Sequence, residues 1–144
     1  MFTHRLWLGV LALLVTSVSA VNQEQPKTIK HTAAKLTSPA SGKEMYVSYC
    51  AVCHGENGKG QGPAADALKM PPSDLTMLAQ KNGGKFPAMQ VSSAIRGDSK
   101  VGAHGSKEMP IWGPVFWQMA QGHTGDYEQR ISNLTKYVES LQGK

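Results

Sequence analysis

Five consecutive residues, Cys50-Ala51-Val52-Cys53-His54, constrain this chain more than any other feature. Two thiols separated by two residues and followed directly by a histidine form the C-x-x-C-H pattern of covalent haem attachment. The spacing suits the chemistry, because each sulfur adds to one vinyl group of the porphyrin and the histidine is then held under the iron. We therefore expect one haem c bound by Cys50 and Cys53, with His54 as proximal iron ligand.

The two cysteines are the only ones in the chain, so any other cysteine site would have to use the same pair. A disulfide of the thioredoxin kind needs a βαβ context, and no strand pattern supplies one. A zinc or dithiol site remains the alternative, and a mature protein found to carry no covalent haem would support it.

Size and composition fit a small haem protein. The chain has 144 residues, 40% of them hydrophobic, with 15 glycines and 8 prolines, which predicts one domain with much loop. A buried macrocycle would add apolar mass to a small core. The formal net charge of +5 comes without the clustered basic and aromatic residues of nucleic-acid-binding proteins. We therefore expect no nucleic-acid partner.

Residues 1–20 have the pattern of a cleavable signal peptide. Arg5 supplies the positive charge, an apolar run follows, and small residues precede the cleavage point after Ala20. The run is shorter than the ~20 residues that a membrane span needs, although an uncleaved anchor is the alternative. We therefore expect export to the periplasm and no transmembrane span in the mature chain.

The folded domain is expected to cover residues 41–144. Residues 21–40 are polar and interrupted by two prolines, which predicts a flexible lead-in. Ser41-Gly42-Lys43-Glu44 then forms a capping box at the start of a helix that runs into Cys50.

Apolar residues at helical spacing predict further helices joined by loops. The last helix has the strongest pattern, with Asp126 as its cap; its apolar residues are Tyr127, Ile131, Leu134, Val138 and Leu141. Shorter helices are expected from Ala64 to Met70, from Ser73 or Asp74 to Asn82, and from Pro87 to Gly97. Residues 98–125 are rich in glycine and proline, which predicts loops. Together these patterns predict an all-α fold.

Met109 is the candidate for the second axial ligand of the iron. It precedes Pro110, which stiffens the backbone after the sulfur, and Trp112, which would exclude solvent. Methionines more often fill cores, and the other methionines are interpreted in that way. His104 is the rival ligand, and a His/His pair would have a lower reduction potential than a His/Met pair.

The second ring nitrogen of His54 also needs a partner that fixes the ring. Residues 55–63 contain four glycines and end in Pro63, which predicts a tight loop against the edge of the haem. Pro63 would present its carbonyl oxygen to that nitrogen.

Three motifs lie between the start of the first predicted helix and the start of the last. They are C-x-x-C-H-G at residues 50–55, Gly62-Pro63, and Met-Pro-Ile-Trp at residues 109–112. In these motifs, over about residues 41–142, the chain resembles a bacterial class I monohaem cytochrome c. The resemblance implies the cytochrome c fold, with short helices and loops wrapped around one haem. It also implies that the first and last helices cross at Gly42 and Tyr137, and it supports Pro63 as the partner of the proximal histidine. Candidates for contact with the haem propionates are Arg96, Trp112 and Tyr46.

The sequence thus predicts a periplasmic single-electron carrier with His/Met ligation. No acid/base pair or activated nucleophile is visible, so we expect no enzyme activity from this chain alone. The expected partners are proteins: a dehydrogenase, a quinol–cytochrome c oxidoreductase or a terminal oxidase. Two alternatives remain open, namely a haem c subunit of a periplasmic oxidoreductase or terminal oxidase complex, and a gas-binding haem sensor with an open sixth site.

Overall fold

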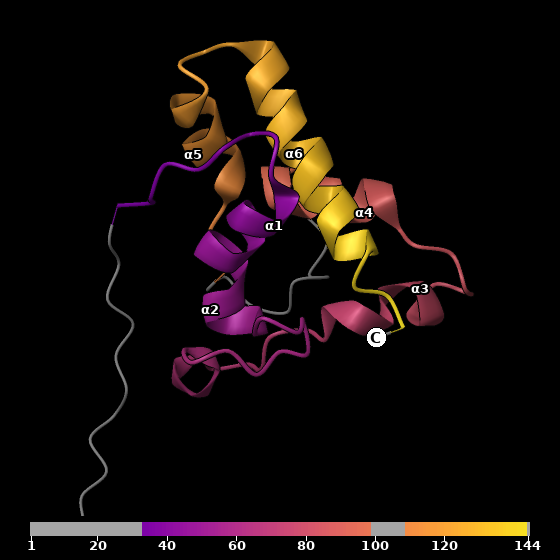
Figure 1. The fold of residues 1–144 in the computed structure, drawn as a ribbon. Helices are drawn as coiled ribbons and strands as arrows, with labels where there is room; N and C mark the ends of the chain where they lie inside the picture. Colours follow the sequence, from indigo (N-terminus) through magenta and orange to yellow (C-terminus); the bar gives the residue numbers. More distant parts are fainter. Residues whose placement is uncertain (1–32, 99–108, 144) are drawn as a thin grey trace, which may run out of the picture.

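The computed structural model describes residues 33–98 and 109–143. Within these ranges the chain is helical and contains no strand, which confirms the expected all-α fold there (Figure 1). No helix in these two ranges is both long and apolar enough to cross a bilayer. The predicted signal peptide, residues 21–32 of the predicted lead-in, and His104 lie outside the described residues.

In the described residues, short helical segments come first in the chain and three longer helices follow. In chain order they are α1 Gly42–Met45, the π-helix η1 Tyr46–Cys50, α2 Ala51–His54, the 3₁₀ turns η2 Ala65–Ala67 and η3 Leu75–Met77, α3 Leu78–Lys81, α4 Ala88–Arg96, α5 Trp112–Met119 and α6 Thr124–Glu139.

The first helical unit runs without a break from Gly42 to His54 through α1, η1 and α2. The Ser41 hydroxyl accepts a hydrogen bond from the N–H of Glu44 at 3.1 Å, as a capping box requires. The Glu44 carboxylate, however, accepts from the N–H of Ser38 instead of returning to Ser41. The π-helix before Cys50 was not predicted; such segments insert extra backbone into a helix and often occur at functional sites.

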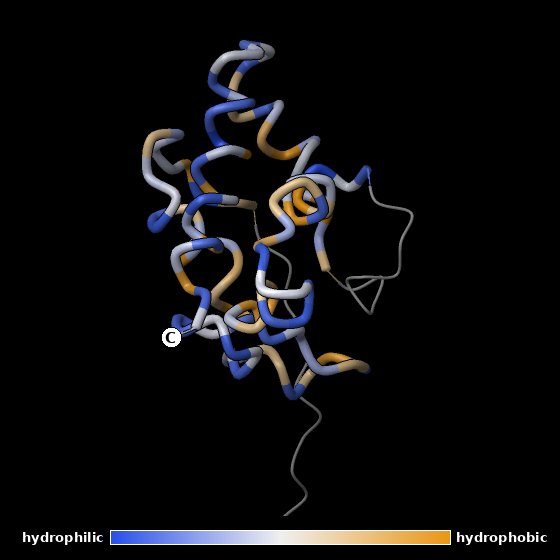
Figure 2. The backbone as a smooth tube through the Cα atoms, turned by 90° about the vertical axis from the view of Figure 1, so that its right-hand side faces the viewer, coloured by the Kyte–Doolittle hydropathy of each residue, from blue (hydrophilic) through white to orange (hydrophobic). Residues whose placement is uncertain are grey.

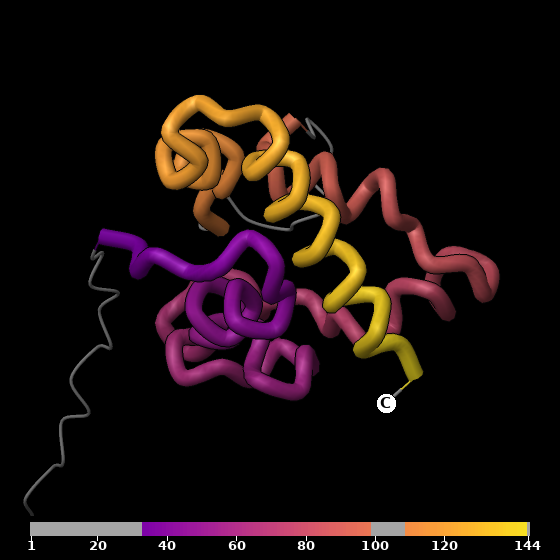
Figure 3. The backbone as a smooth tube through the Cα atoms, turned by 45° about the horizontal axis from the view of Figure 1, so that its top comes forward, coloured from indigo at the N-terminus to yellow at the C-terminus, as the bar shows by residue number. Residues whose placement is uncertain are grey.

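This first unit crosses α6 at Gly42. A Cβ atom built on Gly42 would overlap the carbonyl oxygen of Asn133 and approach Cβ of Tyr137. The Tyr46 ring packs on the Tyr137 ring, with centroids 5.1 Å apart. The contact between Gly42 and Tyr137 implied by the resemblance is therefore confirmed, and α1 lies directly beside α6 (Figures 1 and 3).

The core forms where α5 and α6 meet the first helical unit. Tyr46, Phe116, Met45, Ile131 and Leu134 are its largest fully buried side chains. Apolar and polar residues are interspersed along the helices (Figure 2), as expected for helices that turn one apolar face toward a core.

Helix α5 corrects the prediction that residues 98–125 are loops. Pro114 is the third residue of this helix, where the backbone N–H has no intrahelical partner to lose. The helix forms because Phe116 is completely buried and Trp112 is packed against the same core.

Residues 33–40 correct the prediction of a flexible lead-in up to residue 40. The Thr37 side chain is buried, and its hydroxyl is 2.7 Å from the Tyr49 hydroxyl. Arg130, which is 5% exposed, donates from Nη2 to the Thr37 carbonyl at 2.8 Å. This part of the chain therefore packs on α6 and on the first helical unit.

Most of the other predicted helices are present with shifted ends. Helix α4 ends at Gly97 as expected, with φ of 85°, and Asp74 caps η3. The helix predicted at residues 64–70 is only the turn η2. Helix α6 begins at Thr124, two residues before the predicted cap.

Candidate functional site

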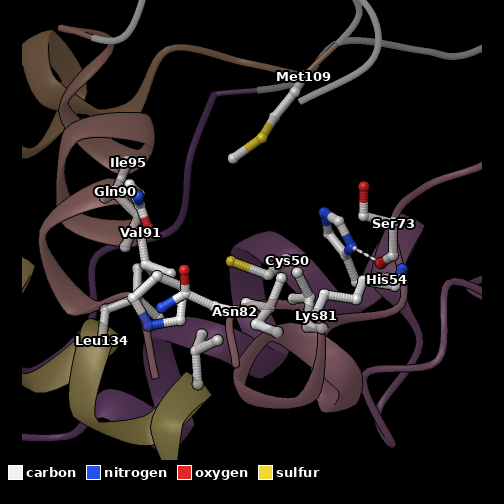
Figure 4. A pocket seen from close by; sticks show the side chains of 14 residues that line it. Cys50, His54, Ser73, Lys81, Asn82, Gln90, Val91, Ile95, Met109 and Leu134 are labelled. Carbon is white, nitrogen blue, oxygen red and sulfur yellow. Dashed lines mark hydrogen bonds between the residues drawn. The ribbon is translucent and has the colours of Figure 1, made fainter. Parts of the chain in front are cut away.

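A cavity of about 340 Å³ lies among the first helical unit, α3, α4 and α6. Its volume falls in the range of ~300–1,000 Å³ that is usual for cofactor pockets. Most described residues along its wall are apolar: Leu75, Leu78, Pro87, Val91, Ile95, Met109, Leu134 and Val138. Cys50, His54 and Met109 reach the same cavity (Figure 4).

His54 is the last residue of α2 and is 9% exposed. Its Nδ1 lies 3.0 Å from the carbonyl oxygen of Ser73. Because a carbonyl only accepts hydrogen bonds, Nδ1 carries the proton and Nε2 presents its lone pair. Burial lowers the pKa of His54, and the hydrogen bond to Ser73 partly opposes this shift. The ring is thus held as a neutral imidazole, the form that binds iron.

The acceptor at Ser73 corrects the prediction of Pro63. The Ser73 carbonyl is positioned by the turn that follows it: the Asp74 carboxylate accepts from the N–H of Thr76 at 2.8 Å, and the N–H of Leu75 donates to Gly58 at 2.7 Å. Sequence reasoning missed Ser73 because every residue has a backbone carbonyl. Which carbonyl lies next to the His54 ring depends on the course of the folded chain, and no residue type reveals it. The available signal was the Asp74 cap, which fixes the backbone next to Ser73.

The loop that ends in Pro63 has a different role. The N–H of Gly60 donates to the carbonyl of His54 at 2.8 Å, and the N–H of Gly62 donates to that of Cys53 at 2.9 Å. These bonds satisfy carbonyls that the end of α2 leaves without intrahelical partners. A Cβ atom on Gly62 would overlap the carbonyl oxygen of Ala51, so only glycine permits this close approach. The loop therefore fixes the C-x-x-C-H segment.

The two cysteines lie on adjacent turns of the first helical unit and are not joined by a disulfide. Cys50 lines the cavity. Burial raises the pKa of the Cys50 thiol, and the nearby Cys53 thiol raises it further. Burial also raises the pKa of Cys53.

Met109 points into the cavity, across its open part from the His54 ring (Figure 4). The backbone that follows is packed tightly on the end of α4. A Cβ atom on Gly97 would overlap the side chain of Ile111, and one on Gly113 would overlap the carbonyl of Arg96. These two glycines thus let the Met109 segment lie close to α4.

Trp112, expected to shield or contact a haem, does not line the cavity. Its ring stacks on that of Tyr49 at 4.9 Å and on that of Phe116 at 5.9 Å. It belongs to an aromatic cluster between η1 and α5, because its place on the first turn of α5 turns it toward that core.

The other two candidates for propionate contact are engaged elsewhere. Arg96 forms a bidentate ion pair with Glu128, at 2.9 and 2.6 Å. The Tyr46 hydroxyl is buried and donates to the carbonyl of Gly55 at 2.7 Å. Neither residue lines the cavity, whereas Lys81, Asn82 and Gln90 do.

The residues of the cavity fit a haem. Imidazole nitrogen and thioether sulfur are an axial pair of cytochromes c, and the thiols of a C-x-x-C-H segment can form thioethers. In the described parts of the chain, no three His, Cys, Asp or Glu side chains gather as they would around a metal ion bound by protein alone. A bound haem would supply a reversible one-electron change at its iron.

Comparison with known proteins agrees with this chemistry. Residues 37–121 match the family described as "Cytochrome C oxidase, cbb3-type, subunit III". Over 105 residues the chain is 29% identical to cytochrome c-554(547) of Halothiobacillus neapolitanus, a match that covers 72% of this chain and 96% of that protein. No solved structure matches the chain. The family match spans more than half of the chain and contains both the C-x-x-C-H segment and Met109. The chain therefore belongs to the cytochrome c family, within its cbb3-type subunit III group.

Proposed function

We propose that this cytochrome c is a periplasmic single-electron carrier whose one haem c is joined to Cys50 and Cys53 and ligated by His54 and Met109. One observation supports the ligand pair above all. The imidazole and the thioether reach the same apolar cavity from separate segments of the chain (Figure 4).

The protein's part in electron transfer is to hold both ligands still and to exclude water. The Ser73 carbonyl fixes the tautomer and direction of the His54 ring, and the contact of Ile111 with Gly97 holds the segment after Met109. Ligands fixed in both oxidation states keep the reorganisation on electron transfer small. A thioether ligand and an apolar wall both raise the reduction potential.

The place of action and the partners follow from sequence and family. The signal-peptide pattern of residues 1–20 supports export, and protein redox partners are expected for a carrier. The family match to an oxidase subunit favours a second candidate, a haem c subunit of a terminal oxidase. Co-purification with a catalytic subunit in mild detergent would favour this candidate, whereas release as a free protein would favour the carrier.

The ligand pair is tested on the mature haem-loaded protein. We expect its mass to include one covalent haem and its ferrous form to bind carbon monoxide poorly at neutral pH. Met109→Ala should open the sixth position, so that carbon monoxide binds readily and the oxidised spectrum changes. Met89→Ala is the matched control, because Met89 is 83% exposed and does not line the cavity. Ready binding to the unmodified protein, or a Met109→Ala spectrum unchanged from it, would contradict the assignment.

A further inference from the structure

Polar side chains on the cavity wall come mainly from one stretch of the chain, residues 81–90. Apart from His54 and Ser73, which form the proximal side, they are Lys81, Asn82 and Gln90. They stand at the end of α3, just after it, and near the start of α4. All three are exposed, so they form the rim where the cavity opens to solvent. Lys81 is the only cationic side chain among the described residues that line the cavity.

The rim and Cys50 are carried by different elements of the fold. Cys50 approaches from the first helical unit, and α3 and α4 lie across from α2 in both views of the fold (Figures 1 and 3). Haem b carries its two vinyl groups, which become the thioether links of haem c, along one edge and its two propionates at the opposite edge. With its former vinyl edge joined to Cys50 and Cys53, a haem would direct its propionate edge away from the first helical unit, toward α3 and α4.

We propose that Lys81, Asn82 and Gln90 form the binding site for the haem propionates, an inference that rests on the proposed function. The Lys81 ammonium balances the carboxylate charge. Asn82 Nδ2 already donates to the carbonyl of Lys85 at 2.7 Å, which orients the amide and leaves its second N–H to donate. Gln90 adds another side-chain amide from α4.

The charges around this rim agree with such a role. The pKa of Asp74 is lowered chiefly by the hydrogen bond from the side chain of Thr76. The charges of Lys81 and Lys59 make only smaller contributions to this shift. No ion pair between Lys81 and a carboxylate is present in the described structure. Lys81 is therefore placed to take an anionic partner from a ligand in the cavity.

The proposal predicts a direction for the reduction potential. Ionised propionates stabilise the ferric state, which carries one more positive charge, and Lys81 offsets their effect. Removing Lys81 should therefore shift the equilibrium toward the ferric state. For one charge at the edge of a partly buried site, the expected shift in the equilibrium constant is about threefold to tenfold.

The experiment compares Lys81→Met with Lys85→Met in the mature haem-loaded protein by spectroelectrochemical titration. Lys85 carries the same charge four residues away, is exposed, and does not line the cavity. We expect Lys81→Met to shift the ferric–ferrous equilibrium constant toward the ferric state by at least about threefold more than Lys85→Met does. The reduction potential of Lys81→Arg should stay near that of the unmodified protein. The propionate bending band in the resonance Raman spectrum should shift in Lys81→Met and Gln90→Leu, and not in Lys85→Met.

The outcomes separate the two claims. Equal potentials and equal Raman bands for Lys81→Met and Lys85→Met would overturn the propionate site and leave the carrier function standing. A mature protein without covalent haem would overturn both.

Discussion

Replacing Gly42 by alanine tests the helix crossing that aligns the haem-attachment segment with α6. The added Cβ would overlap the carbonyl oxygen of Asn133, and Cβ of Tyr137 lies close behind it. Backbone atoms cannot rotate away as a side chain can, so the two helices must separate. Overpacking of this kind costs about 1–3 kcal/mol of the free energy of unfolding.

The alanine also gains up to about 1 kcal/mol of helix propensity over glycine. At the first residue of α1 this gain is smaller, and the net loss should be about 1–2 kcal/mol. In a domain of this size that loss lowers the melting temperature by roughly 4–8 °C per kcal/mol. Gly125→Ala is the matched control, because Gly125 lies in the first turn of α6 and a Cβ there would meet nothing within 4 Å.

The assay is urea unfolding of the haem-loaded protein, followed by far-ultraviolet circular dichroism. We expect a lower midpoint for Gly42→Ala at an unchanged m-value, and an equal or higher midpoint for Gly125→Ala. If Gly42→Ala were as stable as the unmodified protein, the close crossing would be refuted.

Two further variants test individual parts of the structure. Arg130→Ala should cost about 2–4 kcal/mol of unfolding free energy, because it leaves a cavity and removes the hydrogen-bond donor to the Thr37 carbonyl. Arg130→Met keeps the volume of the aliphatic part of the side chain and should cost less. Equal urea midpoints for the two variants would contradict this. Pro63→Ala should leave the reduction potential unchanged, because the carbonyl of Ser73 and not that of Pro63 accepts from His54; a shift in the titration would restore the role predicted for Pro63.

Features set by local patterns were predicted well from the sequence. The Ser41 cap, the glycine end of α4 and the apolar stripe of α6 each depend on residues within a few positions of one another. The same holds for the C-x-x-C-H segment. A glycine inside a predicted helix, Gly42, already suggested a close crossing by another helix, but only the resemblance named Tyr137 as its partner, because nothing local identifies the helix on the other side.

Features set by tertiary contacts were not predicted. Helix α5 forms despite its glycine and proline because burial of Phe116 outweighs weak propensity. Residues 33–40 are fixed by Arg130, which lies more than 90 residues away in the chain. The acceptor at Ser73 and the positions of Arg96 and Trp112 likewise depend on partners that local patterns do not name.

The most direct test of the account is proton NMR of the reduced haem-loaded protein. A methionine bound to ferrous haem iron has its ε-methyl group over the macrocycle, where the ring current shifts the resonance strongly upfield. We predict one such methyl signal, absent in Met109→Ala and retained in Met89→Ala and His104→Ala. Its persistence in Met109→Ala, or its absence from the unmodified protein, would contradict ligation by His54 and Met109.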